Sequence, residues 1–125
     1  MAPVRSARDF ILESDFKMSK KNFLGKWRIA EMQTWDQDYV DAEIPGYISF
    51  DKQGMGEFHF GYVHGYMDCL YTHRNGNEAV EFSWAGNNEM DQATGRGYAT
   101  VKNGTLLGQL FFHEGDNSEF KAIRK

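Results

Sequence analysis

The fold is decided by residues 47–84, which read YISFDKQGMGEFHFGYVHGYMDCLYTHRNGNEAVEFSW. Apolar and polar residues alternate through most of this stretch, and short polar or glycine-containing segments interrupt the alternation. Because successive side chains of a strand point to opposite faces, a period of two predicts β-strands joined by turns. We expect antiparallel strands at about 46–51, 55–63, 66–74 and 78–84.

The register of these hairpins separates the side chains by polarity. With turns at 51–54, 64–65 and 75–77, the apolar residues of all four strands fall on one face. A slip of one residue would move every side chain of a strand to the other face, so this agreement fixes the register. The apolar face, which we expect to point inward, consists of Ile48, Phe50, Phe58, Phe60, Tyr62, Met67, Cys69, Tyr71, Val80, Phe82 and Trp84.

Four more strands complete the expected sheet, at about 26–35, 96–102, 105–113 and 119–124. Eight antiparallel strands with one apolar face have to close into a barrel or fold over as a sandwich, because free edges and an apolar face would otherwise be exposed. We expect an all-β fold, an eight-stranded antiparallel up-and-down barrel over residues 25–125.

Residues 1–24 have a different pattern. Ser6-Ala7-Arg8-Asp9 has the form of a helix capping box, and apolar residues follow it. We expect a short N-terminal helix over about 7–16, connected by a basic linker to the barrel domain of residues 25–125.

The composition excludes several classes of function. Charged residues make up 26% of the chain and the net charge is −4, which disfavours general binding to nucleic-acid phosphates. The N-terminal residues lack a long apolar run, so we expect neither a signal peptide nor a membrane span. The single cysteine, Cys69, lies in a strand pattern and fits a buried structural thiol in a reducing cytoplasm.

The expected turns differ between the two ends of the meander. Short turns fall at every second connection, at 51–54, 75–77 and 103–104, where asparagine and glycine tolerate positive φ. Alternate connections of an up-and-down sheet lie at the same end, so this end should be tightly closed. The other end, called the mouth below, should be open and polar. Its connections are 36–45, 64–65, 85–95 and 114–117.

We expect any ligand to bind at the mouth, in a shallow pocket, because the aromatic side chains would fill much of a small barrel. The mouth carboxylates favour a cation, whereas a plain acidic surface is the alternative. Arg96 could instead bind an anion or pair with Glu89 or Asp91. No motif identifies a cofactor. The candidate ligand-binding residues are Trp35, Asp36, Asp38, Tyr62, His64, Trp84, Asn87, Glu89, Asp91, Arg96, His113 and Asp116.

An enzyme that uses the mouth histidines and carboxylates is a second hypothesis. His113, Asp116 and Ser118 have the chemistry of a base, an orienting acid and a nucleophile, but three residues of one turn seldom point at one another. A turn in which Asp116 or Ser118 caps backbone amides is the simpler interpretation. His59 and His64 are five residues apart, so on one continuous strand they would face opposite sides and would not share a metal.

A third hypothesis is an interaction module that docks a basic partner on its acidic loops or forms a homo-oligomer. An inverted barrel is also conceivable, in which Glu57, His59, Asp68 and Glu81 line the lumen as an active site. That arrangement would bury three carboxylates without a cation and leave large aromatic side chains outside. We therefore expect the apolar face to be inside.

Gly25-Lys26-Trp27 opens the first expected strand, and Ala122-Ile123-Arg124 ends the last. In these features the chain resembles the calycin superfamily, which includes lipocalins, fatty-acid-binding proteins and avidins. Calycin barrels begin with a Gly-x-Trp motif whose indole packs near the closed end against an arginine of the last strand. The resemblance implies that Trp27 plugs this end and that Arg124 is its cation–π partner.

Residues 81–87, 95–99 and 111–118 also look like segments of small bacterial proteins that have no assigned activity. This resemblance covers about 25–125 and implies no ligand. The chain shows neither the disulfide nor the later motifs of lipocalins, so the identity of a ligand is not transferred from them.

Overall fold

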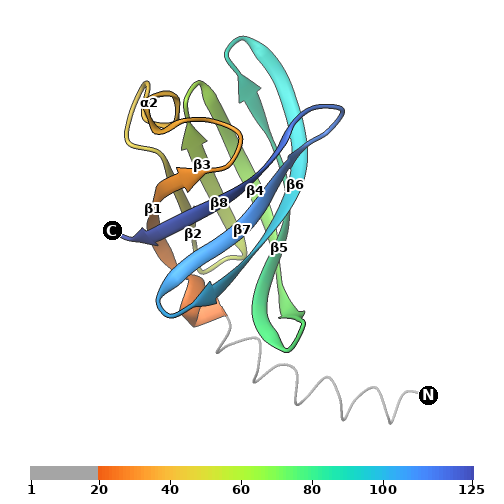
Figure 1. The fold of residues 1–125 in the computed structure, drawn as a ribbon. Coiled ribbons are helices and arrows are strands. Elements are labelled where there is room, and N and C mark those ends of the chain that lie inside the picture. The colour runs from red at the N-terminus through yellow and green to blue at the C-terminus, as the bar shows by residue number, and fades with distance from the viewer. Residues whose placement is uncertain (1–19) are drawn as a thin grey trace, which may run out of the picture.

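The computed structural model describes residues 20–125, in which eight strands form a closed antiparallel barrel in sequence order (Figure 1). Each strand pairs with the next, and β8 pairs with β1, which confirms the expected up-and-down barrel. The elements are β1 (Gly25–Met32), α2 (Gln37–Val40), β2 (Tyr47–Phe50), β3 (Met55–Phe60), β4 (Val63–Arg74), β5 (Asn77–Asn88), β6 (Asp91–Lys102), β7 (Thr105–Phe112) and β8 (Asn117–Arg124). A short helix at 20–23 precedes β1. The helix expected over about 7–16 lies outside the described residues.

The connections gather alternately at two ends, as expected of an up-and-down sheet (Figure 1), but the β3–β4 and β5–β6 turns of the mouth are as short as the β4–β5 and β6–β7 turns of the closed end. The β2–β3, β4–β5 and β6–β7 turns share the closed end with the helix at 20–23. Two of these turns place Asn75 and Asn103 at φ of 52° and 53°, the positive φ that the sequence indicated. The α2 segment and the β3–β4, β5–β6 and β7–β8 turns form the mouth.

The register of β2 to β5 confirms the expected inward face with one exception. Ile48 pairs with Phe58, and Met67 pairs with Trp84; all four side chains are buried. The exception is Tyr62, which is 42% exposed. The polar face lies outside, so the inverted barrel is wrong.

The turn predicted at 64–65 is wrong, and this explains Tyr62. The chain reverses at 61–62, between the paired residues Phe60 and Val63. Gly61 has a φ of 56°, and glycine at the first central position is typical of one type of two-residue hairpin turn. Tyr62 therefore occupies the tip of a hairpin and does not form the floor of a pocket.

The long connection predicted at 85–95 is also wrong. β5 and β6 continue through it and pair as far as Asn88 and Asp91, which leaves Glu89 and Met90 as the turn. Both faces are polar near this tip, so no apolar alternation signals a strand, but the ladder of backbone hydrogen bonds does not need apolar side chains.

The closed end is plugged by Phe23 and Trp27, which are 0% and 1% exposed. The Trp27 Nε1 donates a hydrogen bond to the carbonyl oxygen of Phe23 at 2.9 Å. The Arg124 guanidinium lies 4.0 Å from the centre of the Trp27 ring and donates to the carbonyl oxygens of Asn22, at 2.8 Å, and of Leu24. The contact between Trp27 and Arg124 that the calycin resemblance implied is thus present.

Candidate functional site

The lumen of the barrel is filled by side chains. A cavity of about 10 Å³ lies between Ile29, Met32, Ile48, Phe58, Phe60, Leu110 and Phe120. This volume is at the lower limit for a single water molecule. A ligand in the lumen would have to displace core side chains, so a site for a small molecule is expected on the surface.

The mouth itself is closed by aromatic rings. The Trp35 ring centroid lies 5.0 Å from that of Phe60, 5.9 Å from that of Phe112 and 6.2 Å from that of Tyr39. Phe112 in turn lies 5.1 Å from Trp84 in an edge-to-face arrangement. Trp35 therefore belongs to a plug that covers the core, and does not border an opening into the lumen.

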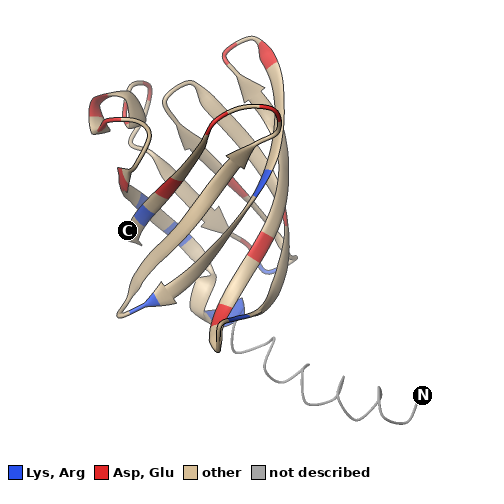
Figure 2. Cartoon of the chain, turned by 45° about the vertical axis from the view of Figure 1, so that its right-hand side comes forward, with Lys and Arg blue, Asp and Glu red and all other residues tan. Residues whose placement is uncertain are grey.

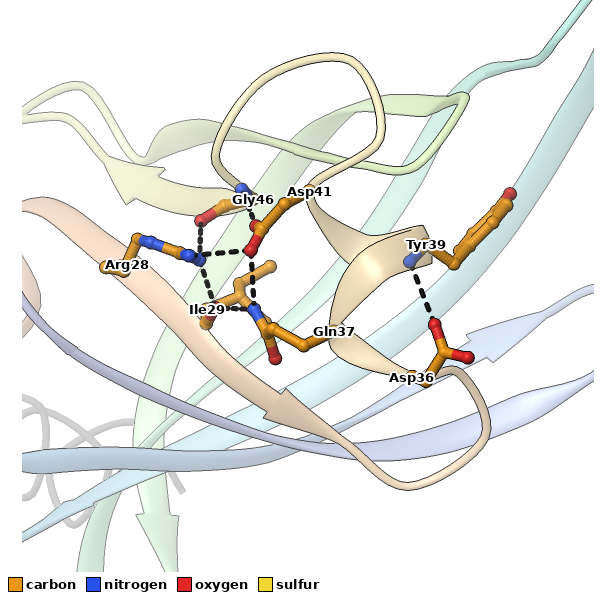
Figure 3. A network of polar contacts seen from close by, with 7 residues as sticks. All are labelled: Arg28, Ile29, Asp36, Gln37, Tyr39, Asp41 and Gly46. Carbon is orange, nitrogen blue, oxygen red and sulfur yellow. Dashed lines mark hydrogen bonds and ion pairs between the residues drawn. The ribbon is translucent and has the colours of Figure 1, made fainter.

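Two of the mouth aspartates hold the α2 segment in place (Figure 3). The Oδ1 of Asp36 caps α2 by accepting a backbone amide of its first turn at 2.9 Å. Asp41 accepts from the Arg28 guanidinium at 2.7 Å, from the Gln37 side chain at 3.1 Å and from the Gly46 amide at 2.9 Å. These carboxylates bind the chain itself, so their acidity does not indicate a ligand.

The network around Asp41 makes the stability of the fold depend on pH. Burial raises the pKa of this carboxyl, but the hydrogen bond from the Gly46 amide and the ion pair with Arg28 lower it and together outweigh burial. A carboxyl with a lower pKa in the folded state stabilises the fold above its unfolded-state pKa, and the stabilisation is lost as the pH falls through the folded-state value.

We expect the Asp41→Asn substitution to lower the free energy of unfolding at pH 7 by about 1–2 kcal/mol, because the charge-assisted hydrogen bonds are lost. Urea unfolding at a series of pH values measures this. The difference from the wild type should shrink as the pH falls through the lowered folded-state pKa of the wild-type carboxyl. Asp38→Asn, an exposed change in the same helix, is the control and should stay within about 0.5 kcal/mol. If Asp41→Asn lowers the free energy of unfolding by the same amount at all pH values, the electrostatic explanation is contradicted.

The other mouth carboxylates are exposed, on loops and turns, in α2 or at the start of β6 (Figure 2). Glu89 and Glu114 occupy turn positions with φ of 58° and 59°. Within residues 20–125, no three or more histidine, cysteine or acidic side chains are placed to hold a metal ion. The described carboxylates therefore supply no preformed ligand set for a metal cation.

His59 and His64 lie side by side on the outer wall, contrary to the expectation that they face opposite sides. The turn at 61–62 separates them, so they pair directly across β3 and β4 with ring centroids 5.1 Å apart. The His64 Nε2 lies 3.1 Å from the Glu57 Oε2, which also accepts the Tyr47 hydroxyl at 2.6 Å. These two hydrogen bonds lower the pKa of Glu57. The His59 Nε2 lies 3.0 Å from a carboxylate oxygen of Glu43.

His113, Asp116 and Ser118 do not converge. Ser118 is 0% exposed, and its Oγ accepts the Thr34 amide at 3.0 Å and donates to the Glu119 carbonyl at 2.8 Å. Its hydroxyl thus accepts a backbone amide, as expected, but this amide belongs to the loop after β1 and not to the 114–117 turn. His113 is exposed at the β7–β8 turn.

A groove of about 700 Å³, here called the wall groove, crosses the outer surface from β4 to β7. The small Ser83 of β5 pairs with Asp68 of β4 and Arg96 of β6, and the larger outward side chains Leu70, Tyr98 and Phe111 also line the groove. Cys69 also lines it, and burial raises the pKa of its thiol to about 12. The thiol therefore stays protonated at neutral pH, which fits a structural role.

A second hollow of about 620 Å³, here called the mouth cleft, adjoins the wall groove, and both are lined by Ser83, Arg96 and Phe111. It lies where β6 continues toward the mouth beyond its last pair with β7, Gly95 with Phe112. The absence of a side chain at Gly95 lets the Trp84 indole reach across β6, because a Cβ there would lie 2.7 Å from the Trp84 Nε1. This Nε1 donates to the Phe111 carbonyl at 3.2 Å.

Arg96 stands where the two hollows meet. Its guanidinium lies 5.5 Å from the centre of the Phe111 ring, and its side chain is exposed. No carboxylate oxygen of residues 20–125 lies within 4.0 Å of its guanidinium nitrogens. The pairing with Glu89 or Asp91 that the sequence suggested as an alternative is therefore wrong.

The structure brings three of the expected ligand-binding residues together, since Trp84, Arg96 and His113 all line the mouth cleft. Trp35 and Asp36 stabilise the mouth, and His64 belongs to the outer-wall network. The remaining candidates are exposed at the hairpin tips and mouth loops: Asp38, Tyr62, Asn87, Glu89, Asp91 and Asp116.

Sequence analysis missed the outward residues that form the wall groove. Leu70 and Ser83 were assigned to the outer face, but nothing suggested that this face is hollow. The hollow depends on the sizes of side chains from four strands, the small Ser83 and the larger Leu70, Tyr98 and Phe111 among them, and such a combination is not visible in any one strand.

Comparison of the chain with protein-family models, with curated proteins and with solved structures gave no match. Among residues 20–125, no helix has the length and apolar character required to cross a bilayer. The interpretation of the site therefore depends on its own geometry.

Proposed function

We propose that the protein is a calycin-like binding barrel that holds a small molecule on its outer wall, in the mouth cleft and the adjoining wall groove. The observation that carries this proposal is that Arg96 and His113 line a cleft of about 620 Å³, whereas the cavity between the core side chains measures about 10 Å³. Small-molecule sites are commonly hollows of about 300–1,000 Å³ lined by apolar groups and a few polar ones.

The chemistry of the lining supports a binding role. Phe111 and Phe112 provide apolar surface, while Arg96 and His113 provide polar groups that can orient a ligand. A cytoplasmic location, suggested by the single cysteine, is part of the same proposal. The enzymatic alternative, with a mouth histidine and carboxylate as catalysts, stays a prediction.

Two fluorescent probes test whether the hollow binds small molecules. We expect 8-anilinonaphthalene-1-sulfonate, an anion, or its neutral analogue N-phenyl-1-naphthylamine to bind the full chain saturably. Ser83→Phe should weaken this binding by about tenfold or more, because Ser83 lines both hollows and a larger side chain would fill them.

Ala85→Phe is the matched control. Ala85 is exposed on β5, two residues beyond Ser83 on the same face, but it lines neither hollow. Its substitution should change the affinity by no more than about twofold. If neither probe saturates, or if both variants weaken binding equally, the proposed site is wrong.

A further inference from the structure

We infer that the ligand of this site is a planar anion, whose acidic group binds the Arg96 guanidinium while its ring lies against Phe111. This inference rests on the proposed function and adds the chemical class of the ligand. A carboxylate, a sulfonate and a phosphate share the required chemistry, since each presents oxygen atoms that a guanidinium can bind in a bidentate manner.

The first argument is that Arg96, unlike Arg74, has no carboxylate partner among the described residues 20–125. Arg74, which also lines the wall groove, has its Nη1 3.7 Å from a Glu81 carboxylate oxygen and its guanidinium 3.8 Å from the centre of the Tyr98 ring. Arg96 lines both hollows and forms no ion pair with residues 20–125. Arg74 is thus paired with Glu81 and Tyr98, whereas the hydrogen-bond donors of Arg96 face the hollows that it lines.

The second argument is that close packing of the β6 backbone fixes the position of Arg96. Gly95 and Gly97 flank it, and a Cβ at Gly97 would lie 2.5 Å from the Phe82 ring. The inner face of β6 is therefore pressed against Trp84 and Phe82, and Arg96 points away from the core between two glycines. An arginine on such a closely packed strand is positioned with little backbone freedom.

The third argument concerns the body of the ligand. Phe111 is half-buried, lines both hollows and already lies under the Arg96 guanidinium at 5.5 Å. A ring placed beside it would gain aromatic contact at the same time as its acidic group reaches Arg96. Asp68, Glu81 and Glu114 also line the hollows and would repel the acidic group of a ligand from their own parts of the surface. The acidic surroundings therefore orient an anionic ligand.

The two probes named above separate this inference from the proposed function, because they differ in the sulfonate group alone. In Arg96→Gln, we expect the affinity for 8-anilinonaphthalene-1-sulfonate to fall by about tenfold, as for loss of hydrogen bonds to a charged group. The affinity for N-phenyl-1-naphthylamine should change by less than about twofold. Lys102→Gln is the matched control, because Lys102 is an exposed cation on the same face of β6 that lines neither hollow, and it should leave both affinities within about twofold.

Three outcomes are distinguishable. The inference is supported if Arg96→Gln lowers the affinity for the sulfonate probe but not for the neutral probe, and if Arg96→Lys partly restores it. Binding of both probes that Ser83→Phe weakens but Arg96→Gln leaves unchanged overturns the inference while the proposed site stands. Failure of both probes to saturate, or equal effects of Ser83→Phe and Ala85→Phe, overturns the proposed site and the inference with it. Thermal unfolding of each variant identifies any that does not fold.

Discussion

Replacing Trp27 with alanine is expected to lower the free energy of unfolding by about 3–5 kcal/mol, the range for large aromatic side chains removed from a core. Trp27 is 1% exposed, and its Nε1 donates to the Phe23 carbonyl at 2.9 Å. The substitution would leave a cavity at the closed end and would remove the hydrogen bond to this carbonyl. It would also remove the ring that the Arg124 guanidinium contacts. Equilibrium unfolding in urea measures the change.

The control for this prediction is the neighbouring residue. Lys26 is exposed and contacts the outer-wall Tyr47 ring at 4.2 Å, so Lys26→Ala should cost less than about 1 kcal/mol. A loss below about 1 kcal/mol for Trp27→Ala as well would mean that the indole does not hold the closed end together. Because Phe23 contacts Phe50 and Tyr71 with ring centroids 5.9 and 5.7 Å away, a large loss would show that the plug and the core unfold together.

The architecture was predictable from the sequence because one constraint reinforced another. Turn residues such as Asn75-Gly76 limit the possible registers of a hairpin. One of these registers places the apolar residues of both strands on the same face. The barrel closes in sequence order, as a meander with one apolar face requires. Local patterns were sufficient here because most strand partners are adjacent in the sequence.

The two turn errors have a common physical origin. Glycines mark turns when their φ is positive, but Gly65 and Gly86 lie within strands, where they allow close packing. Sequence analysis could not distinguish these two uses of glycine, because the difference depends on which backbone or ring lies against the residue in space. The error at Gly65 placed Tyr62 in the core and separated His59 from His64.

The candidate site was predicted only in part, for a different reason. The mouth was correctly located, but its acidic residues were taken as the main signal, and Asp36 and Asp41 prove to cap and tether the α2 segment. The wall groove arises from side-chain sizes on neighbouring strands, and no single strand carries that information. Arg96 could be named from the sequence, whereas the absence of an ion pair between Arg96 and residues 20–125 required the structure.

Replacing Gly86 with alanine is expected to destabilise the protein by roughly 2–4 kcal/mol, because overpacking against a fixed backbone forces the strands apart. A Cβ at Gly86 would lie 1.8 Å from the His64 carbonyl oxygen and 2.9 Å from the Gly65 Cα. β4 has little room to withdraw, since Gly65 itself packs against the Phe58 and Trp84 rings. The close approach of β4 and β5 therefore depends on paired glycines at this point.

Gly115→Ala provides the matched control for Gly86→Ala. A Cβ at Gly115 would meet the Phe112 Cβ at 3.1 Å and no backbone atom closer than 3.9 Å, and the residue lies in an exposed turn. It should therefore cost less than about 1 kcal/mol in the same urea titration. Equal, small losses in both variants would mean that β4 and β5 can separate freely at Gly86. A large loss of unfolding free energy confined to Gly86→Ala would instead show that close backbone contact between β4 and β5 shapes this long hairpin. The same hairpin carries Ser83 and Trp84, which line the proposed site.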